Sequence, residues 1–206
     1  MEEFNREAHW QKIYTTKQLN EVSWYQQTPT TSLEYFSQLN IPLNASIIDV
    51  GGGDSFLVDH LLNLGYTNIT ILDISLAAII RAKERIAEKS SLVKWIVSDV
   101  VHFKPEEKYD VWHDRAAFHF LTDAEDINQY KKITSNHISK NGYLIVGTFS
   151  KEGPTKCSGI NIQQYSKENL EQTFSENFNL QSSQFINHST PFNTIQQFIF
   201  CCFQKK

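Results

Sequence analysis

The residues best placed for chemistry are a run of glycines and three aspartates near the ends of apolar segments. Gly51, Gly52 and Gly53 follow the apolar run "SIIDV", and Asp49 precedes Gly51 by two residues. A glycine cluster after a buried strand lets the backbone come close to a ligand, because no side chain stands in the way. The sequence therefore predicts a ligand site at this turn. The ligand could be a pyrophosphate, a triphosphate or a molecule without phosphate.

The glycine run departs from both common phosphate-binding loops. No lysine follows the glycines, so the run is not a P-loop. Gly51 and Gly53 fill the first two positions of the Gly-x-Gly-x-x-Gly fingerprint, but Phe56 stands at the third. Asp49 would repel a phosphate and attract an ammonium group. Together these residues predict a ligand that carries an amino-acid moiety.

Two further aspartates occupy equivalent positions after the next two apolar segments. Asp73 ends the second expected strand, where a carboxylate can accept both ribose hydroxyls. Asp99 ends the third, where its side chain could accept an adenine amino group while the N–H of Val100 meets a ring nitrogen. The three aspartates would then bind the ammonium, ribose and adenine groups of one ligand. Any one of these aspartates could instead be a strand-end cap or a turn residue.

Strand-like and helix-like segments alternate along the chain. Strands are expected at 46–50, 68–75, 92–100, 108–114 and 141–150, and helices at about 3–14, from 31, at 55–65, 76–88, 122–137 and 166–174. The spacing of Thr31 to Glu34 and of Thr122 to Glu125 suggests capping boxes. The alternation predicts a doubly wound, mainly parallel α/β sheet of the Rossmann-like class, closed by a C-terminal antiparallel hairpin around 191–193. Ligands of such sheets bind at the carboxyl ends of the strands, where the glycines lie.

Composition narrows the class of protein. A chain of 206 residues suits one domain, with 1–40 as a helical lid segment and 41–206 as the sheet core. The net charge of −4 gives no electrostatic footprint for nucleic acid or an anionic membrane. Three cysteines, two of them adjacent, do not suggest a disulfide framework. The acidic N-terminus and the short apolar runs predict a cytoplasmic protein. The spacing of His and Cys residues matches no metal-binding motif, so we predict no metal.

Five segments in order resemble the class I, seven-stranded S-adenosylmethionine-dependent methyltransferases: "IIDVGGGDS", "ITILDIS", "WIVSDVVHF", "YDVWHDRAAFHFL" and "ISKNGYLIVGTF". The resemblance covers roughly residues 40–206 and implies a seven-stranded sheet, a single methyltransferase domain and S-adenosylmethionine as cofactor. It assigns the methionine end to Asp49, Gly51 and Gly53, the ribose to Asp73 and the adenine to Asp99 and Val100, and it adds Ile74 to the cofactor-binding residues.

The end of the fourth strand bears on the acceptor. It lacks the Asn/Asp-Pro-Pro-Tyr/Phe motif of enzymes that methylate amino groups of bases, and it resembles thiopurine S-methyltransferases through Trp112, Asp114 and Arg115, with His113 inserted. That resemblance implies that Arg115 approaches the acceptor. An Asp114–Arg115 pair that fixes the loop is an equal alternative. His113 could act as a base or merely hydrogen-bond the loop, whereas His119 is expected to pack in the core.

Aromatic residues precede the sheet. Trp24 and Tyr25, in an irregular stretch, are expected to form a lid over cofactor and acceptor, and similar "WY" segments occur in related enzymes, including some protein lysine methyltransferases. Trp10 and Tyr14 are expected to pack on the core instead. Cys157, in a polar loop after the fifth strand, is expected near the acceptor.

We therefore predict an S-adenosylmethionine-dependent methyltransferase that transfers a methyl group to a small molecule by in-line displacement. Such transfer mainly needs alignment, and a base only when the acceptor is protonated. A protein (lysine) acceptor, and outside enzymes a non-catalytic cofactor-binding protein, stay open. An NAD-dependent oxidoreductase is disfavoured by Phe56 and the hairpin. The expected partners are a small substrate or a protein, with no nucleic acid or membrane, and the expected state is a monomer or homodimer.

Overall fold

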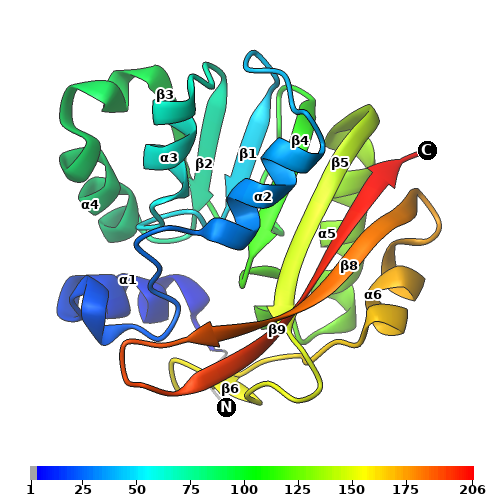
Figure 1. Cartoon of the computed structure of the whole chain (residues 1–206). Coiled ribbons are helices and arrows are strands. Elements are labelled where there is room, and N and C mark those ends of the chain that lie inside the picture. The colour runs from blue at the N-terminus through cyan, green and yellow to red at the C-terminus, as the bar shows by residue number, and fades with distance from the viewer. Residues whose placement is uncertain (1–3) are drawn as a thin grey trace.

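A seven-stranded sheet forms the centre of the protein, in the order β3-β2-β1-β4-β5-β9-β8 (Figure 1). The computed structural model describes residues 4–206, so the expected helix start at Glu3 lies outside the described residues. The parallel strands are β1 (Ile47–Val50), β2 (Ile69–Asp73), β3 (Val93–Val97), β4 (Tyr109–Arg115) and β5 (Ile138–Phe149). β9 (Ile195–Lys205) pairs antiparallel with β5 and with β8 (Phe178–Ser189). The predicted fold class, including the closing hairpin, is confirmed.

Helices cover both faces of the sheet (Figure 1). One face packs against α2 (Thr30–Gln38), α3 (Leu57–Leu64) and α4 (Leu76–Ile86), and the other against α5 (Ala124–His137) and α6 (Lys167–Phe174). Alternate residues of β1 serve the two faces, since Ile47 lies in the first core cluster and Ile48 in the second. Burial on both faces explains why the central strands are almost continuously apolar.

The strand order reverses at β1, which pairs with β2 on one side and β4 on the other. The chain then turns through Gly51 in a left-handed conformation, with φ of 66°, which glycine adopts without a steric penalty. Asp49 lies in β1, Asp73 ends β2, and Asp99 follows β3 by two residues. The parallel strands thus bring all three aspartates to the same edge of the sheet.

Helix α1 (Arg6–Thr16) and the 3₁₀ turn η1 (Leu19–Glu21) lie across this edge (Figure 1). The side-chain oxygen of Gln11 accepts hydrogen bonds from the Ser75 hydroxyl (3.0 Å) and the Ala77 N–H (3.1 Å) at the start of α4. Arg81 of α4 donates to the carbonyls of Tyr14 (3.0 Å) and Lys17 (2.8 Å). These polar contacts fix the N-terminal segment over the carboxyl ends of the strands.

Two predicted helix caps are wrong in detail. The N-cap of α2 is Pro29, so Thr31 lies inside the helix, and the N-cap of α5 is Asp123, whose carboxylate accepts the N–H of Glu125 at 2.7 Å. The polar loop after β5 contains a two-stranded ribbon that the sequence did not predict. It is formed by β6 (Lys156–Cys157) and β7 (Ile160–Asn161), and the remaining 3₁₀ turns are η2 (Ala87–Leu92) and η3 (Phe118–Phe120). Within residues 4–206 no helix has the length and apolarity needed to cross a bilayer.

Candidate active site

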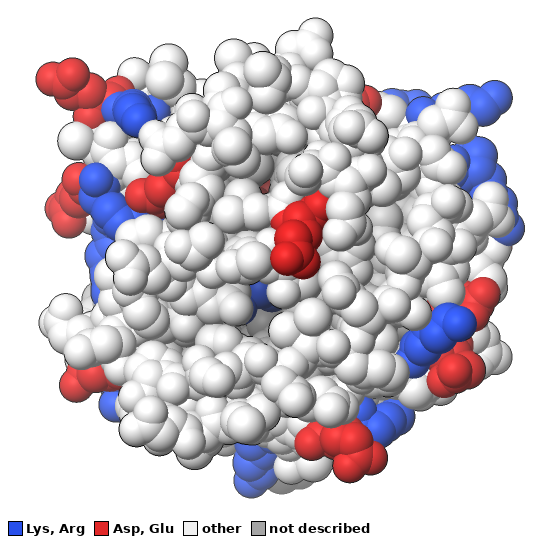
Figure 2. Space-filling model, viewed as in Figure 1, with Lys and Arg blue, Asp and Glu red and all other residues white. Residues whose placement is uncertain are grey.

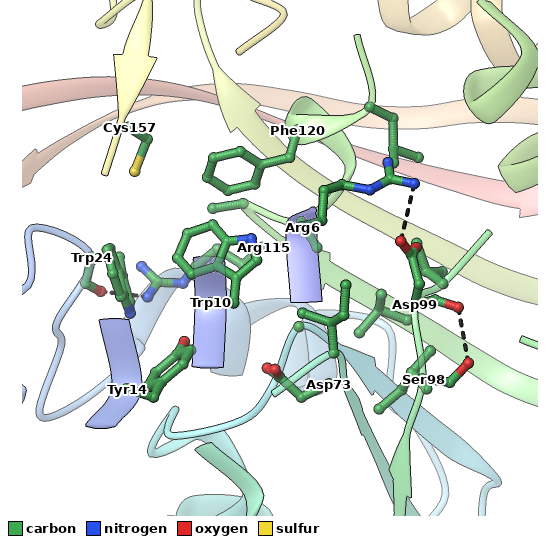
Figure 3. Close-up of a pocket in the computed structure, with 18 of the residues that line it drawn as sticks. Arg6, Trp10, Tyr14, Trp24, Asp73, Ser98, Asp99, Arg115, Phe120 and Cys157 are labelled. Carbon is green, nitrogen blue, oxygen red and sulfur yellow. Dashed lines mark hydrogen bonds and ion pairs between the residues drawn. The ribbon is translucent and has the colours of Figure 1, made fainter. Parts of the chain in front are cut away.

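A pocket of about 830 Å³, its solvent-open mouth included, lies between the carboxyl edge of the sheet and the N-terminal segment (Figure 3). Figure 3 shows Ser98 and Asp99 at one end, Trp24 and Cys157 at the other, and Asp73 between them. We call the first the acidic end and the second the aromatic end. The lining of the aromatic end is mostly aromatic and includes Trp10, Tyr14, Trp24, Phe120, Phe149 and Phe198.

Asp73 lines the middle of the pocket. Its side chain is buried and accepts the N–H of Ser75 at 2.8 Å. Burial is the largest influence on this carboxyl and raises its pKa to about 7. A side chain on Gly53 would collide with the Asp73 carboxylate and would come within 2.7 Å of the Ala78 Cβ. The second glycine of the predicted motif therefore supports Asp73 from behind and does not itself line the pocket.

Asp99 forms an ion pair that the sequence did not predict. One carboxylate oxygen lies 3.0 Å from the Arg6 guanidinium, and the other accepts the N–H of Val101 at 3.1 Å. Arg6 also lies 2.7 Å from Asp126 at the start of α5. The pair joins α1 to the acidic end of the pocket, which Val100 and, nearer the middle, Ile74 also line.

His113 and Asp49 lie behind the pocket. The Nδ1 of His113 donates to Asp49 Oδ1 at 2.7 Å, and its Nε2 accepts from the Ser32 hydroxyl at 2.9 Å. His113 is only 2% exposed and is not among the pocket-lining residues. Because both ring nitrogens are engaged inside the protein, the structure does not support the predicted role of His113 as a base toward an acceptor.

The second oxygen of Asp49, Oδ2, is buried and has no hydrogen-bond partner within residues 4–206. A side chain on Gly52 would come within 2.5 Å of this oxygen, so it points toward the glycine turn. Such a buried, unpaired carboxylate oxygen is costly unless a ligand or water satisfies it. It is the one Asp49 atom that remains available at the turn.

Asp114 and Arg115 have separate roles and do not pair with each other. The buried Asp114 accepts the N–H groups of Ala117 (2.9 Å) and Phe118 (3.0 Å) and the Tyr130 hydroxyl (2.8 Å). It thereby fixes the loop after β4 without help from arginine. Arg115 lines the pocket instead and donates to the Trp24 carbonyl at 2.6 Å. Burial lowers the pKa of Arg115 to about 10, which leaves it charged at neutral pH.

The N-terminal segment contributes more to the pocket than predicted. Trp10 lies edge-on to Trp24 and Phe120, with ring centroids 5.7 and 4.9 Å apart, and Tyr14 lies 6.2 Å from Trp24. Trp10 and Tyr14 therefore line the pocket rather than only packing on the core. Their i, i+4 spacing on an otherwise polar helix was the available signal. Tyr25 lies outside this pocket, edge-on to Phe56.

The structure also shows where Cys157 and His119 lie, two residues that were singled out from the sequence. Cys157 is buried and lines the aromatic end, and burial raises the pKa of its thiol. His119 is fully buried beside Phe149, where its Nδ1 accepts a backbone N–H at 3.2 Å. Burial lowers the pKa of His119 to about 3, so it is a neutral core residue. Within residues 4–206 no cluster of three His, Cys, Asp or Glu side chains could hold a metal ion.

The residues around the pocket fit an adenosyl amino-acid ligand better than a phosphate. Asp73 offers acceptors to a diol, and Ile74, Val100 and Leu121 give apolar surface for a flat ring. The unpaired oxygen of Asp49 lies behind the pocket beside the glycine turn, where it suits an ammonium group. A pyrophosphate at the glycine turn would instead face the carboxylates of Asp49 and Asp73. The residues present therefore fit S-adenosylmethionine.

Comparisons with known proteins point the same way. Residues 47–142 match the model of a methyltransferase domain. The chain is 24% identical to the human EEF1A lysine methyltransferase 2 over 188 residues, which cover 84% of this chain and 73% of the relative. It is 27% identical over 108 residues to malonyl-[acyl-carrier protein] O-methyltransferase 2 of Ilyobacter polytropus, covering 52% of this chain and 40% of that protein.

Solved structures share the fold. An S-adenosylmethionine-dependent methyltransferase from Anabaena variabilis superposes with a TM-score of 0.76 at 11% identity, covering 99% of this chain and 96% of that one. The N-methyltransferase NodS from Bradyrhizobium japonicum, in complex with S-adenosylhomocysteine, gives 0.71 at 14% identity, covering 98% and 99%. These structures show that the fold is shared. From the domain match, the relatives named as methyltransferases and the fitting pocket, we conclude that the protein is a methyltransferase that uses S-adenosylmethionine.

Proposed function

We propose that this enzyme methylates a small molecule held at the aromatic end of the pocket. The observation that carries the proposal is the closure of that end by Trp10, Tyr14 and Trp24, which leaves an apolar chamber beside the expected methionine position. A chamber of this kind suits a compact acceptor. Residues 1–40, as the lid segment, and 41–206, as the sheet core, would act together as one methyltransferase domain.

The cofactor would lie along the pocket from the acidic end toward the aromatic end. Asp73 and Ile74 would hold its ribose, and Asp99 and Val100 its adenine. Gly51 and Gly53 would shape the turn at the methionine end, where Asp49 Oδ2 would accept the ammonium group. When bound, the cofactor supplies a methyl group on a sulfonium, which is already a good leaving group.

The protein's own contribution is mostly alignment and exclusion of water. Trp24 and Trp10 would keep solvent from the acceptor, and the loop fixed by Asp114 would set its distance from the methionine end. His113, the predicted base, does not reach the pocket. The acceptor would therefore have to enter the pocket already deprotonated, and the positive charge of Arg115 would favour that form.

A protein lysine is a second candidate acceptor, because a relative that this chain matches over 73% of the relative's length is named as a lysine methyltransferase. In this chain the anchored α1 and Trp24 cover the aromatic end. A lysine side chain would need this segment to open, or a path past the small neighbouring pocket lined by Tyr25 and Gln26.

Calorimetry with S-adenosylhomocysteine, with NAD as the negative control, tests the cofactor site. Saturable binding that Asp73→Ala removes is expected. A second assay would follow transfer of a labelled methyl group to pools of small molecules and, separately, to proteins. Label that appears only on protein would overturn the small-molecule proposal, and NAD binding without S-adenosylhomocysteine binding would overturn the cofactor assignment.

A further inference from the structure

Two polar groups at the aromatic end have no acidic partner. Arg115 donates to the Trp24 carbonyl but forms no ion pair among residues 4–206. The Tyr14 hydroxyl makes no hydrogen bond within the same residues, and it faces the pocket. Figure 3 shows the Tyr14 oxygen pointing toward the space beside the Arg115 guanidinium. Two donors, one of them charged, therefore border one part of the pocket.

The carboxylates of the site are engaged elsewhere. Asp49 pairs with His113 behind the pocket, and Asp99 pairs with Arg6 at the opposite end. Asp73 accepts the N–H of Ser75 and is held over the glycine turn. None of them forms an ion pair with Arg115. A partly buried cation without a counter-charge is unfavourable, and a bound anion would relieve it.

Burial lowers the pKa of Arg115 more than the nearby charge of Asp49 raises it, and the two side chains form no ion pair within residues 4–206. The hairpin that contributes Phe198 to the pocket has no Asp, Glu, Lys or Arg from residue 177 to residue 204. In the view of Figure 2 most charged side chains lie near the outline of the molecule, and an acidic side chain lies near the centre. Arg115 is therefore the cationic side chain of the aromatic end, whereas Arg6 lies at the acidic end.

Resting on the proposed function, we propose that the methyl acceptor is a small organic anion whose carboxylate or similar group is recognised by Arg115 and Tyr14. Arginine can present two N–H groups to a carboxylate, and a phenol hydroxyl can donate a third hydrogen bond. The apolar body of the acceptor would pack against Trp10, Phe120 and Phe149. A lysine ammonium group would be repelled by Arg115, so the same arrangement selects against a lysine acceptor.

Benzoate, benzamide and benzylammonium are suitable probes because they share a ring and differ in charge. Each would be titrated into the full chain saturated with S-adenosylhomocysteine, with binding followed by ligand-observed NMR and calorimetry. We expect benzoate to bind at least about tenfold more tightly than either other probe, as a charge-assisted pair requires.

Variants assign the effect to the two donors. Arg115→Gln keeps a donor for the Trp24 carbonyl but removes the charge, and should weaken benzoate about tenfold or more. Tyr14→Phe removes one oxygen and should weaken it about threefold to tenfold. Arg115→Lys should restore part of the loss. Tyr143→Phe, whose hydroxyl contacts Gln204 far from the pocket, is the matched control and should leave binding unchanged.

The outcomes separate this inference from the cofactor assignment. Benzylammonium binding as tightly as benzoate, or no saturable benzoate binding to the loaded wild type, would overturn the anionic acceptor. A different contrary result is that Arg115→Gln and Tyr14→Phe both lose affinity for S-adenosylhomocysteine while benzoate binds no more tightly than benzamide. That result would assign the two donors to the carboxylate of the cofactor and would also overturn the anionic acceptor. A wild-type protein that binds no S-adenosylhomocysteine would instead contradict the proposed function itself.

Discussion

His113 Nδ1 donates to Asp49 Oδ1 across 2.7 Å, and both side chains are almost completely buried. The pair links β4 to β1 directly beneath the glycine turn, because Asp49 and His113 are register partners in the parallel sheet. Ser32 of α2 completes the chain of hydrogen bonds from the other ring nitrogen. The contacts of His113 therefore hold Asp49 in place, with the second Asp49 oxygen beside the glycine turn.

Removing His113 should reduce stability rather than change chemistry at the acceptor. His113→Ala leaves the Asp49 carboxylate and the Ser32 hydroxyl buried without partners, so we expect a loss of about 3 kcal/mol, which corresponds to a lower Tm by about 10 °C for a chain of this size. His113→Asn can still donate to Asp49 and should lose clearly less. Differential scanning calorimetry measures both. A His113→Ala protein of normal stability that had lost only the acidic limb of its pH–rate profile would restore the role of base.

The pH dependence of cofactor binding should report Asp73. Its pKa is raised to about 7 by burial, so the ligand-free protein carries a proton there at mildly acidic pH, whereas two ribose hydroxyls require an acceptor. Affinity for S-adenosylhomocysteine should therefore rise as pH increases toward 7, by at most about tenfold per unit, and level off above it. Calorimetry at several pH values, in buffers of different ionisation enthalpy, would detect the released proton. Asp73→Asn should abolish the dependence along with most of the binding.

The raised pKa of the Asp73 carboxyl also makes the stability of the folded protein depend on pH. A folded-state pKa above the unfolded value means that the folded protein holds the proton more tightly. Its contribution is fully present below about pH 4 and is lost as pH rises through about 7. Asp73→Asn should therefore raise Tm relative to wild type at pH 8 and have little effect near pH 4. An equal effect at both pH values would show that Asp73 does not carry the shifted pKa.

Gly53 should be intolerant of any side chain. A Cβ there would collide with the Asp73 carboxylate and with Ala78 of α4, and the packed start of α4 cannot move freely. Gly53→Ala is expected to lower S-adenosylhomocysteine affinity by about tenfold or more and to lower Tm. Gly159→Ala is the matched control, because nothing lies within 4 Å of its added Cβ and only its positive φ is strained. It should cost some stability while leaving the affinity unchanged.

The doubly wound, mainly parallel sheet with its closing hairpin was predictable from sequence, and so was the edge at which the three aspartates meet. Apolar runs alternating with amphipathic segments require a parallel sheet, and a parallel sheet brings Asp49, Asp73 and Asp99 to one edge whatever the details of the helices. Gly65 was also predictable as a helix end, and it takes a left-handed conformation with φ of 93°. These features depend on local pattern and on rules of topology.

Side-chain partners were not predictable in the same way. The partner of Asp49 is His113, 64 residues away, and the partner of Asp99 is Arg6, on a helix whose docking direction no local pattern specifies. His113 was a candidate base because it is one of two histidines near the end of the fourth strand, and a role in fixing the loop was the alternative. In a strand, side chains two residues apart point to the same face, so His113 and Arg115 share a face of β4. They differ in depth along the strand, because His113 is buried against Ser32 of α2, whereas Arg115 is the last residue of β4 and lines the pocket.

Arg6 should control how firmly the N-terminal segment closes the pocket. Its guanidinium lies 3.0 Å from Asp99 and 2.7 Å from Asp126, and its side chain is 23% exposed, so the pairs are partly screened but act as a network. Arg6→Gln should weaken S-adenosylhomocysteine binding by about threefold to tenfold, mainly through faster dissociation, because the lid opens more often. Stopped-flow displacement measures the rate, and Lys94→Gln, which removes the remote exposed pair with Glu107, is the control. If Arg6→Gln instead slowed association and left dissociation unchanged, α1 would act in steering the cofactor rather than in retaining it.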